Sequence, residues 1–206
     1  TYNLVSKQYS SLTDRAGMRH AGRKAMDIII KDLRNAGYSH EDSTCPAIIR
    51  PIYSYDGGNS KEDKLEIIYD VSSKDQDKLI IERRKIIYEV NNKQLYKEVS
   101  NDTVATCNPS SKILYSDLED QLLIKNVEDL QFEGMKKGDN HNVCGADIIN
   151  IYLTVKSNKE HGNERKFLLE QNANSELMEN ISDKYLRETF TTSVLLRNIF
   201  YGGTCT

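Results

Sequence analysis

The chain has 206 residues, of which 38% are hydrophobic and 29% are charged, and its formal net charge is −3. This composition fits one soluble domain, and its interspersed charges offer no basic surface for nucleic acid or anionic lipid. No apolar run is long enough to cross a bilayer, and no secretory signal is visible. Because the first residue is Thr rather than Met, we expect a processed or trimmed chain.

The first predicted element is an amphipathic helix that ends near Tyr38. In the segment AMDIIIKDLRNAGY, hydrophobic residues recur at the spacing of one helical face. The residues expected to pack on the body of the protein are Met26, Ile29, Ile30 and Leu33. Arg34 complements the helix dipole, and Gly37 readily takes a left-handed capping conformation.

The same face becomes less hydrophobic toward the N-terminus. Traced backward, it contains Arg23, Arg19, Ala16, Leu12, Tyr9 and Val5. Because two arginines interrupt this face, we expect the segment from Thr1 to Gly22 to leave the domain body.

After Tyr38, short runs rich in Ile, Val, Tyr and Leu alternate with polar clusters, which predicts strands. The expected strands are Ala47–Tyr53, Lys64–Val71, Lys78–Glu82, Lys85–Val90, Leu95–Val99, Val127–Glu133, Asp147–Val155, Arg165–Glu170 and Leu186–Phe200. Asn91-Asn92-Lys93-Gln94 joins two of them as a hairpin. The expected loops are Ser54–Asp63, Ser72–Asp77, Gly134–Gly145 and Ser157–Glu164. One helix followed by antiparallel strands predicts an α+β fold without a domain boundary.

No group of residues predicts an enzyme. The four histidines are scattered, and none belongs to a recognisable nucleophile motif. His141 and Cys144 lie close together but share a polar loop, which disfavours a functional pair. The loop from Asp56 to Asp63 has oxygen ligands suited to calcium but lacks EF-hand spacing, which favours a solvated turn. Glu82-Arg83-Arg84-Lys85 is interpreted as a solvated strand boundary. We therefore expect no catalytic residue, metal or cofactor.

The four cysteines are far apart and form no CxxC pair; they are Cys45, Cys107, Cys144 and Cys205. This spacing is poor for a zinc site and favours disulfides in an oxidising compartment over ordinary thiols.

Four segments together resemble one family. RKAMDIIIKDLRNAGY, Arg23–Tyr38, looks like the helix end of minor pilins of the PilW type and of the related J-type pseudopilins of type II secretion. KIIYEVNNKQLYKEV, Lys85–Val99, is similar to the family's hairpin. NVEDLQFE, Asn126–Glu133, resembles one of its strands, and TTSVLLRN, Thr191–Asn198, resembles its C-terminal ending. The segments follow the family's order and span nearly the whole chain.

The resemblance implies an α+β, pilin-like fold, in which a long N-terminal helix packs on a mainly antiparallel β-sheet head. Residues 1–38 would be the C-terminal part of the pilin helix and residues 39–206 the β-rich head of one structural domain. The apolar N-terminal half of that helix would anchor the protein in the inner membrane. The prepilin peptidase motif, the mature N-terminal Phe that becomes methylated and the nearby Glu are absent from this sequence.

The resemblance implies a non-enzymatic minor pilin that packs with other minor pilins and the major pilin to initiate or cap a type IV pilus. It would face the periplasm from the bacterial inner membrane and then join the cell-surface pilus, with no nucleic-acid partner. The candidates for partner contact are Arg15, Arg19, Arg23 and Ile28, the last about 200° around the helix from Met26. Alternatively, the sheet covers Ile28 and water surrounds the arginines.

Two other functions stay open. One is a J-type minor pseudopilin in the tip complex of a type II secretion system. The other is a secreted β-rich ligand-binding domain, whose pocket the 12 tyrosines would line.

The disulfide pairing does not follow from the resemblance. The strand from Asp147 and the strand ending near Phe200 could lie antiparallel, which favours Cys144 with Cys205 and leaves Cys45 with Cys107.

Overall fold

The structure of the protein is a computed structural model. It describes residues 2–43, 45, 48, 51–55, 64–75, 78–103, 116–135, 146–169 and 179–198. In this part of the chain, a helix, α1 (Tyr2–Asn35), is followed by strands that all pair antiparallel. The strands are β1 (Ile52–Tyr55), β2 (Lys64–Asp75), β3 (Lys78–Asn91), β4 (Gln94–Thr103), β5 (Ser116–Lys125), β6 (Val127–Met135), β7 (Ile148–Leu169) and β8 (Glu179–Leu195).

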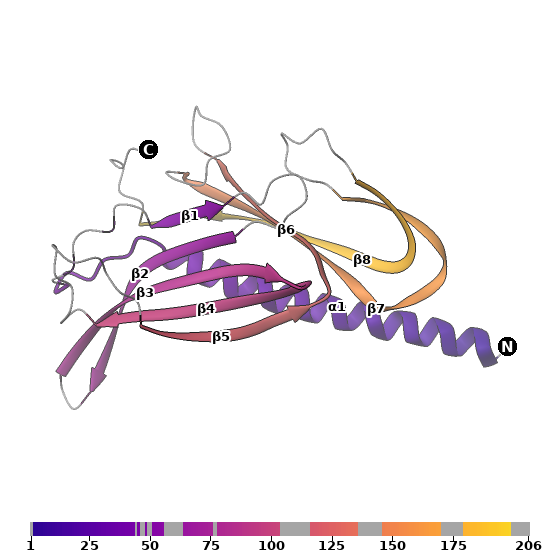
Figure 1. Cartoon of the computed structure of the whole chain (residues 1–206), viewed down its shortest axis with the longest axis horizontal. Helices are drawn as coiled ribbons and strands as arrows, with labels where there is room; N and C mark the ends of the chain where they lie inside the picture. The colour runs from indigo at the N-terminus through magenta and orange to yellow at the C-terminus, as the bar shows by residue number, and fades with distance from the viewer. Residues whose placement is uncertain are drawn as a thin grey trace.

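The strands form two sheets that both lie along α1 (Figure 1). Sheet A has the order β1-β2-β3-β4-β5, and sheet B has the order β6-β7-β8. The N-terminal end of α1 projects beyond both sheets (Figure 1). This arrangement confirms the predicted α+β fold with a long N-terminal helix packed on antiparallel strands.

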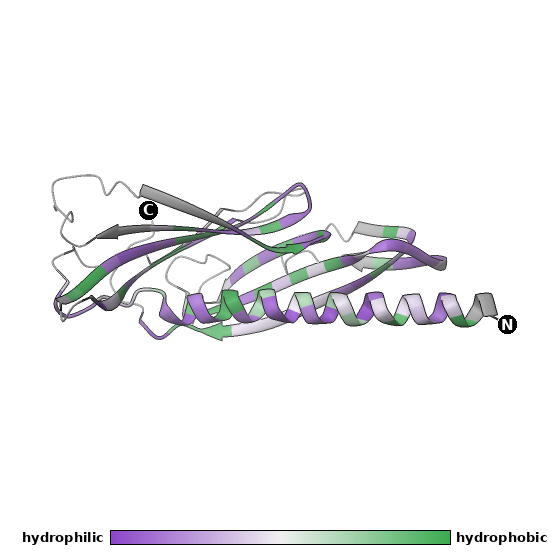
Figure 2. Ribbon diagram, turned by 90° about the horizontal axis from the view of Figure 1, so that it is seen from below, coloured by the Kyte–Doolittle hydropathy of each residue, from purple (hydrophilic) through white to green (hydrophobic). Residues whose placement is uncertain are grey.

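The core lies between α1 and the inner faces of the two sheets. From the helix, Met26, Ile29 and Leu33 are buried, and Ile30 is partly buried against the same cluster. In Figure 2 the hydrophobic residues of α1 gather beneath the sheets, whereas the N-terminal half is mostly polar with isolated hydrophobic residues. Sheet B contributes the predicted buried face of one long strand, namely Ile149, Ile151, Leu153 and Val155.

The packing face of α1 extends further toward the N-terminus than predicted. Met18, Gly22 and Ala25 are buried, and they lie on the same side of the helix as Ile29 and Leu33. The expectation that residues 1–22 leave the body is therefore wrong for the second half of that segment. The sequence pattern missed this face because its residues are mostly small rather than large and hydrophobic.

Gly37 ends the helix as predicted. Its φ is +77°, in the left-handed region, and its N–H donates to the carbonyl of Ile68 in β2 at 2.9 Å. A Cβ at this position would lie 2.4 Å from the carbonyl oxygen of Asn198. The end of the helix is therefore locked between β2 and the segment that follows β8.

The predicted β3–β4 hairpin is present, with a tighter turn. Asn91 pairs with Gln94, so only Asn92 and Lys93 form the turn, with φ values of 51° and 60°. Two positive φ values are typical of a type I′ turn, whose twist matches that of the strands.

Several strands are longer than predicted. β3 is continuous, so the charged run Glu82–Lys85 lies inside a strand and is not a solvated boundary. The predicted loop Ser157–Glu164 lies within β7, where the pairing with β8 shifts register twice. β2 continues to Asp75, into the predicted loop Ser72–Asp77, and β5 was not predicted.

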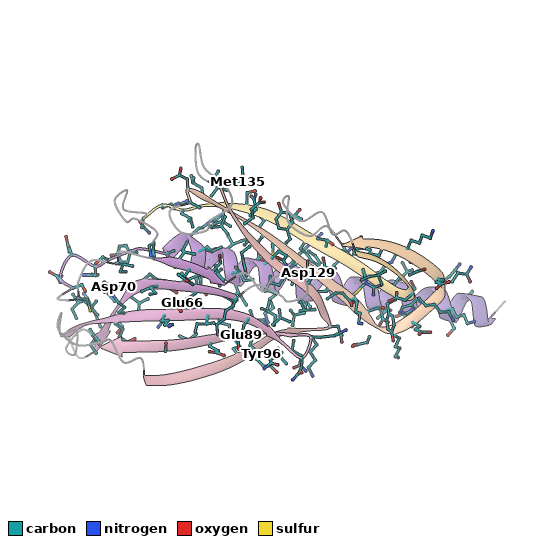
Figure 3. All side chains as sticks on the ribbon, turned by 45° about the horizontal axis from the view of Figure 1, so that its top comes forward. Glu66, Asp70, Glu89, Tyr96, Asp129 and Met135 are labelled. Carbon is teal, nitrogen blue, oxygen red and sulfur yellow. The ribbon has the colours of Figure 1, made fainter. Side chains whose placement is uncertain are left out.

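A charged cluster on the outer face of sheet A explains how β3 accommodates the charged residues Glu82–Lys85. Arg83 is 3% exposed, and its Nε lies 2.8 Å from Oδ1 of Asp70, which is itself buried. Asp70 also accepts a hydrogen bond from the backbone N–H of His40 at 3.1 Å. On the same face, Glu66 and Glu89 form ion pairs with lysines of the neighbouring strands (Figure 3).

Candidate assembly surface on the N-terminal helix

The β7–β8 hairpin contacts the middle part of α1 at three points. His161 of β7 lies with its Nε2 2.7 Å from Oδ2 of Asp14, and the imidazole is buried. Arg19 donates from Nε to Glu188 of β8 at 2.7 Å. One turn further on, the ring of Phe190 packs so closely on Gly22 that a Cβ there would lie 2.2 Å from it.

These three contacts hold the helix along sheet B upstream of the main core. Because His161 and Asp14 are 147 positions apart, nothing in the local sequence indicates their contact.

Asp32 is a buried residue of α1 that contacts side chains of sheet A. It is 4% exposed and accepts hydrogen bonds from the hydroxyl of Tyr69 at 3.0 Å and from that of Tyr88. The Nζ of Lys97 lies 2.6 Å from Oδ2 of Asp32, the oxygen that also accepts from Tyr88. Burial and the Asp32 carboxylate raise the pKa of both tyrosines, so the hydroxyls stay protonated as donors.

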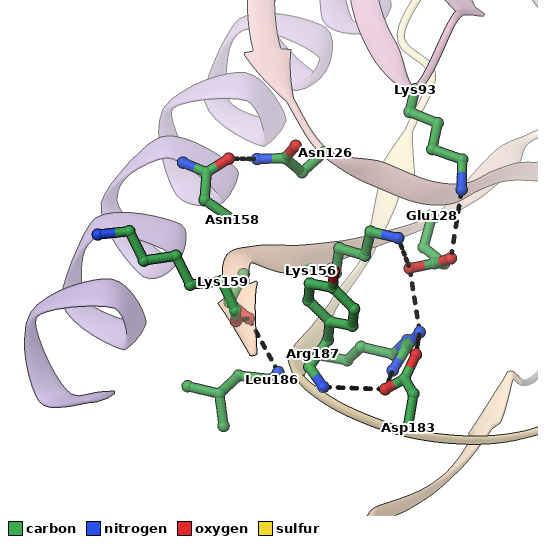
Figure 4. A network of polar contacts seen from close by, with 11 residues as sticks. Lys93, Asn126, Glu128, Lys156, Asn158, Lys159, Asp183, Leu186 and Arg187 are labelled. Carbon is green, nitrogen blue, oxygen red and sulfur yellow. Dashed lines mark hydrogen bonds and ion pairs between the residues drawn. The ribbon is translucent and has the colours of Figure 1, made fainter. Parts of the chain in front are cut away.

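A second charged cluster links the three strands of sheet B around Glu128 of β6 (Figure 4). Lys156 and Arg187 lie 3.5 and 3.3 Å from Glu128, and Arg187 also makes two contacts of 2.6 Å with Asp183. Hydrogen bonds from Arg187 lower the pKa of Asp183 from 3.8 to about 2, against the opposing effect of burial. The cluster lies beside the position where the pairing of β7 with β8 shifts register, between Lys156 and Glu160.

Three large hydrophobic residues lie exposed in one row on the outer face of α1. Val5, Tyr9 and Leu12 are 58%, 73% and 66% exposed. Their spacing of four and three residues places them one above another on the helix, roughly 100° or more from the buried face of Met18 and Gly22. We name these three residues the apolar row. Exposed apolar side chains stacked on one side of a helix make this row a candidate contact site for another molecule.

The predicted partner-binding residues fall at different places. Arg15 and Arg23 are exposed on α1. Arg19 is also exposed but already pairs with Glu188 of the same chain. Ile28 is half-buried, packs against the core and lines a pocket between α1 and sheet A.

The cysteines are only partly described. Cys45 is 9% exposed and disulfide-bonded. Cys107, Cys144 and Cys205 lie outside the described residues, so both predicted pairings stay predictions. His141 and the loop from Asp56 to Asp63 also lie outside them.

Within the described ranges, no three His, Cys, Asp or Glu side chains come together as metal ligands. The helix in the same part of the chain is not apolar enough to cross a membrane.

A long N-terminal helix laid along antiparallel sheets defines the type IV pilin-like fold, and the protein has this fold. The structure is similar to that of a type IV-like pilin from Thermus thermophilus, with a TM-score of 0.58 and 13% sequence identity. The similarity covers 88% of this chain and 98% of that one.

The sequence identifies the family. Residues 11–174 match the family described as prepilin peptidase-dependent protein B, and the chain belongs to that family. It is therefore a pilin-like protein. No curated protein sequence matches the chain.

Proposed function

We propose that the protein is a minor pilin, related to the PilW type, that packs with other minor pilins and the major pilin to initiate or cap a type IV pilus. The observation that carries this proposal is the apolar row of Val5, Tyr9 and Leu12, which is exposed on the N-terminal part of α1. In a pilin-like protein, a neighbouring pilin helix with an apolar face is the partner that fits such a row. The work of the protein is association, and no reaction is assigned to it.

Arg15 and Arg23 are exposed on α1 after the apolar row and would meet acidic side chains of the neighbouring subunits. Arg19 would help in another way, because its pair with Glu188 holds the helix against β8. In this proposal the head lies in the periplasm, the inner membrane holds an upstream apolar helix, and the assembled subunit reaches the cell-surface pilus.

The upstream helix can be tested directly on the native protein. Mass spectrometry of the protein from the membrane or pilus fraction should find an N-methylated Phe, followed by an apolar segment of roughly 20 residues that joins Thr1. A chain that begins behind a conventionally cleaved signal peptide would contradict the proposal.

The apolar row can be tested by substitution in the full-length protein. Tyr9→Glu with Leu12→Glu should reduce co-purification with the other pilins by about tenfold or more, because charges would be buried against an apolar helix. Ser6→Glu is the control, since Ser6 is exposed on another side of the same turn. Equal loss in the control would show that any added charge disturbs the helix.

A J-type minor pseudopilin would share this architecture and the same surface. A deletion strain separates the two functions, because loss of pili indicates the pilin and loss of exoprotein release indicates the pseudopilin. The secreted ligand-binding domain is disfavoured, because core side chains fill most of the space between α1 and the two sheets.

A further inference from the structure

The exposed face of α1 between residues 19 and 34 carries mostly positive charge. Every residue that is exposed in this stretch is ionisable: Arg19, His20, Arg23, Lys24, Asp27, Lys31 and Arg34. Five of these seven residues are Lys or Arg, and Asp27 is the one carboxylate among them. The whole helix has seven Lys and Arg against three Asp, a net charge of +4, whereas the net charge of the chain is −3. Positive charge is therefore concentrated on α1.

Most of these cations have no partner in the part of the chain that the structure describes. Arg19 pairs with Glu188. The other four form no ion pair with any described residue, and we name them the basic ridge: Arg23, Lys24, Lys31 and Arg34. A solvated helix face usually alternates acidic and basic residues at four-residue spacing, and the helix dipole favours cations only in the last turn. Neither effect accounts for Arg23 and Lys24 in mid-helix.

The basic ridge continues the line of the apolar row. Steps of three or four residues along a helix keep to one side of it. Beyond Leu12, such steps pass through Ala16, His20, Arg23, Asp27, Lys31 and Arg34. The ridge is about 16 Å long at the usual rise per residue of a helix. A partner that lies along this side of α1 meets an apolar stretch first and a basic stretch next.

We infer that the basic ridge selects a neighbouring subunit with carboxylates on its contact face and rejects a second copy of this chain. Carboxylates opposite the ridge would be attracted to it, whereas a second copy packed through the same face would place cations against cations. The inference rests on the proposed function for the identity of the neighbour. It adds how the subunit chooses that neighbour, whose contact face should be apolar and then acidic in the same order.

The selection can be measured with the chain alone, because reversing the charges of the ridge creates the partner that it should bind. The acidic-ridge variant carries Arg23→Glu, Lys24→Glu, Lys31→Glu and Arg34→Glu and keeps the apolar row. In sedimentation velocity at low salt, the unmodified chain and the variant should each stay monomeric. Their equimolar mixture should form a one-to-one complex. High salt should weaken this complex by about tenfold or more, because salt screens exposed charges.

A matched variant separates the position of the charges from their number. The control carries four reversals to Glu that change the net charge equally, at residues exposed on the β7–β8 hairpin: Lys159, Arg165, Lys166 and Lys184. Its mixture with the unmodified chain should form no complex. Far-UV circular dichroism verifies that each variant is folded, and Arg23→Glu with Lys31→Glu replaces the fourfold ridge variant if that one is not. No complex in the first mixture, a complex with the control, or self-association of the unmodified chain at low salt would overturn the inference.

Other polyanions are tested with the same two proteins. The probes are vesicles that contain phosphatidylglycerol and, separately, duplex DNA. Neither probe should retain the unmodified chain at physiological salt. Retention that the acidic-ridge variant loses would assign the ridge to that polyanion and overturn the inference.

The partner itself is tested with the full-length protein in its native host. The acidic-ridge variant should reduce co-purification with the other pilins by about tenfold or more, and the hairpin control should leave it unchanged. Unchanged co-purification with the acidic-ridge variant, together with a loss for Tyr9→Glu with Leu12→Glu, overturns the inference and leaves the proposed function standing. A full-length protein that co-purifies with no pilin, while the purified mixture forms its complex, overturns the proposed function and supports the selectivity of the ridge.

Discussion

Asp32 is an acidic residue on the buried face of a helix, and it is stable there because three donors surround it. Two tyrosine hydroxyls and the ammonium of Lys97 contact its two oxygens. Burying a carboxylate without such partners would cost several kcal/mol. The charge was visible in the sequence, one position before Leu33, but its partners on β2, β3 and β4 were not.

Removal of this carboxylate should destabilise the fold. Asp32→Ala should lower the free energy of unfolding by about 3–5 kcal/mol, because Lys97 would be left largely buried without a counter-ion. Urea unfolding followed by circular dichroism measures the change. In the double variant with Lys97→Met, part of the loss should be recovered, since the unpaired charge is also gone. A loss below about 1 kcal/mol in Asp32→Ala would contradict this account.

Asp183 gives a stability effect that depends on pH. Its pKa is lowered from 3.8 to about 2 by hydrogen bonds from Arg187, so the folded state favours the ionised form. The stabilisation is therefore complete above pH 3.8, and it is lost as the pH falls toward 2. Asp183 is partly exposed, with 29% of its side chain accessible, which limits the size of the effect.

The free energy of unfolding of Asp183→Asn should be compared with that of the unmodified protein from neutral pH down to about pH 2. Asp183→Asn should be the less stable protein at neutral pH, and the difference should disappear near pH 2. Free energies of unfolding in urea at several pH values measure the difference. Asp27→Asn, which changes an exposed carboxyl on α1, should show no comparable trend. A difference for Asp183→Asn that is constant with pH would contradict the proposed cause.

At the scale of elements, one contact between α1 and the β7–β8 hairpin requires a residue without a side chain, namely Gly22. Phe190 occupies the space that a Cβ on Gly22 would need. Glycine is otherwise a poor residue in a helix, because it loses more backbone entropy on folding than alanine does. Its presence in mid-helix is explained here by close packing, not by turn geometry.

Two glycines of the same helix should therefore respond in opposite directions. Gly22→Ala should destabilise the protein by about 1–3 kcal/mol, because the Phe190 ring must move. Gly17→Ala should stabilise it by roughly 0.5–1 kcal/mol, because no atom lies within 4 Å of the added Cβ. Thermal and urea unfolding of the two variants measure both effects. Stabilisation by Gly22→Ala would mean that the helix and β8 do not pack as described.

At the scale of the molecule, α1 has three parts with different environments. The C-terminal part is buried between both sheets, the middle part is gripped by the β7–β8 hairpin, and the N-terminal part projects (Figure 1). The N-terminal part of α1 carries the apolar row, whose exposed side chains are available to a partner.

Stepwise shortening of the helix should reveal these parts. Deletion of residues 1–10 should leave the urea midpoint nearly unchanged, because Val5 and Tyr9 are exposed. Deletion of residues 1–20 should lower it clearly, because Met18 and the pairs of Asp14 and Arg19 would be lost. Equal midpoints for both truncations would show that the middle part adds no stability. A large effect of the first deletion would show that the projecting part contacts the head.

The sequence by itself determined the features that depend on neighbours along the chain. Gly37 ends the helix and Asn92 opens a hairpin turn because both effects depend on local backbone conformation. The alternation from Ile149 to Val155 predicted a buried sheet face because successive strand residues point to opposite sides. These local signals, with the family resemblance, were enough for the pilin-like fold, although they did not predict β5.

Only the tertiary structure decided which side of α1 is buried at Met18, Gly22 and Ala25, because small residues give a weak hydrophobic pattern. It also decided that Arg83 is buried, since the compensating charge of Asp70 comes from another strand. The contact of His161 with Asp14 was decided in the same way, because contacts between distant segments arise from packing of whole elements and leave no periodic trace in the sequence.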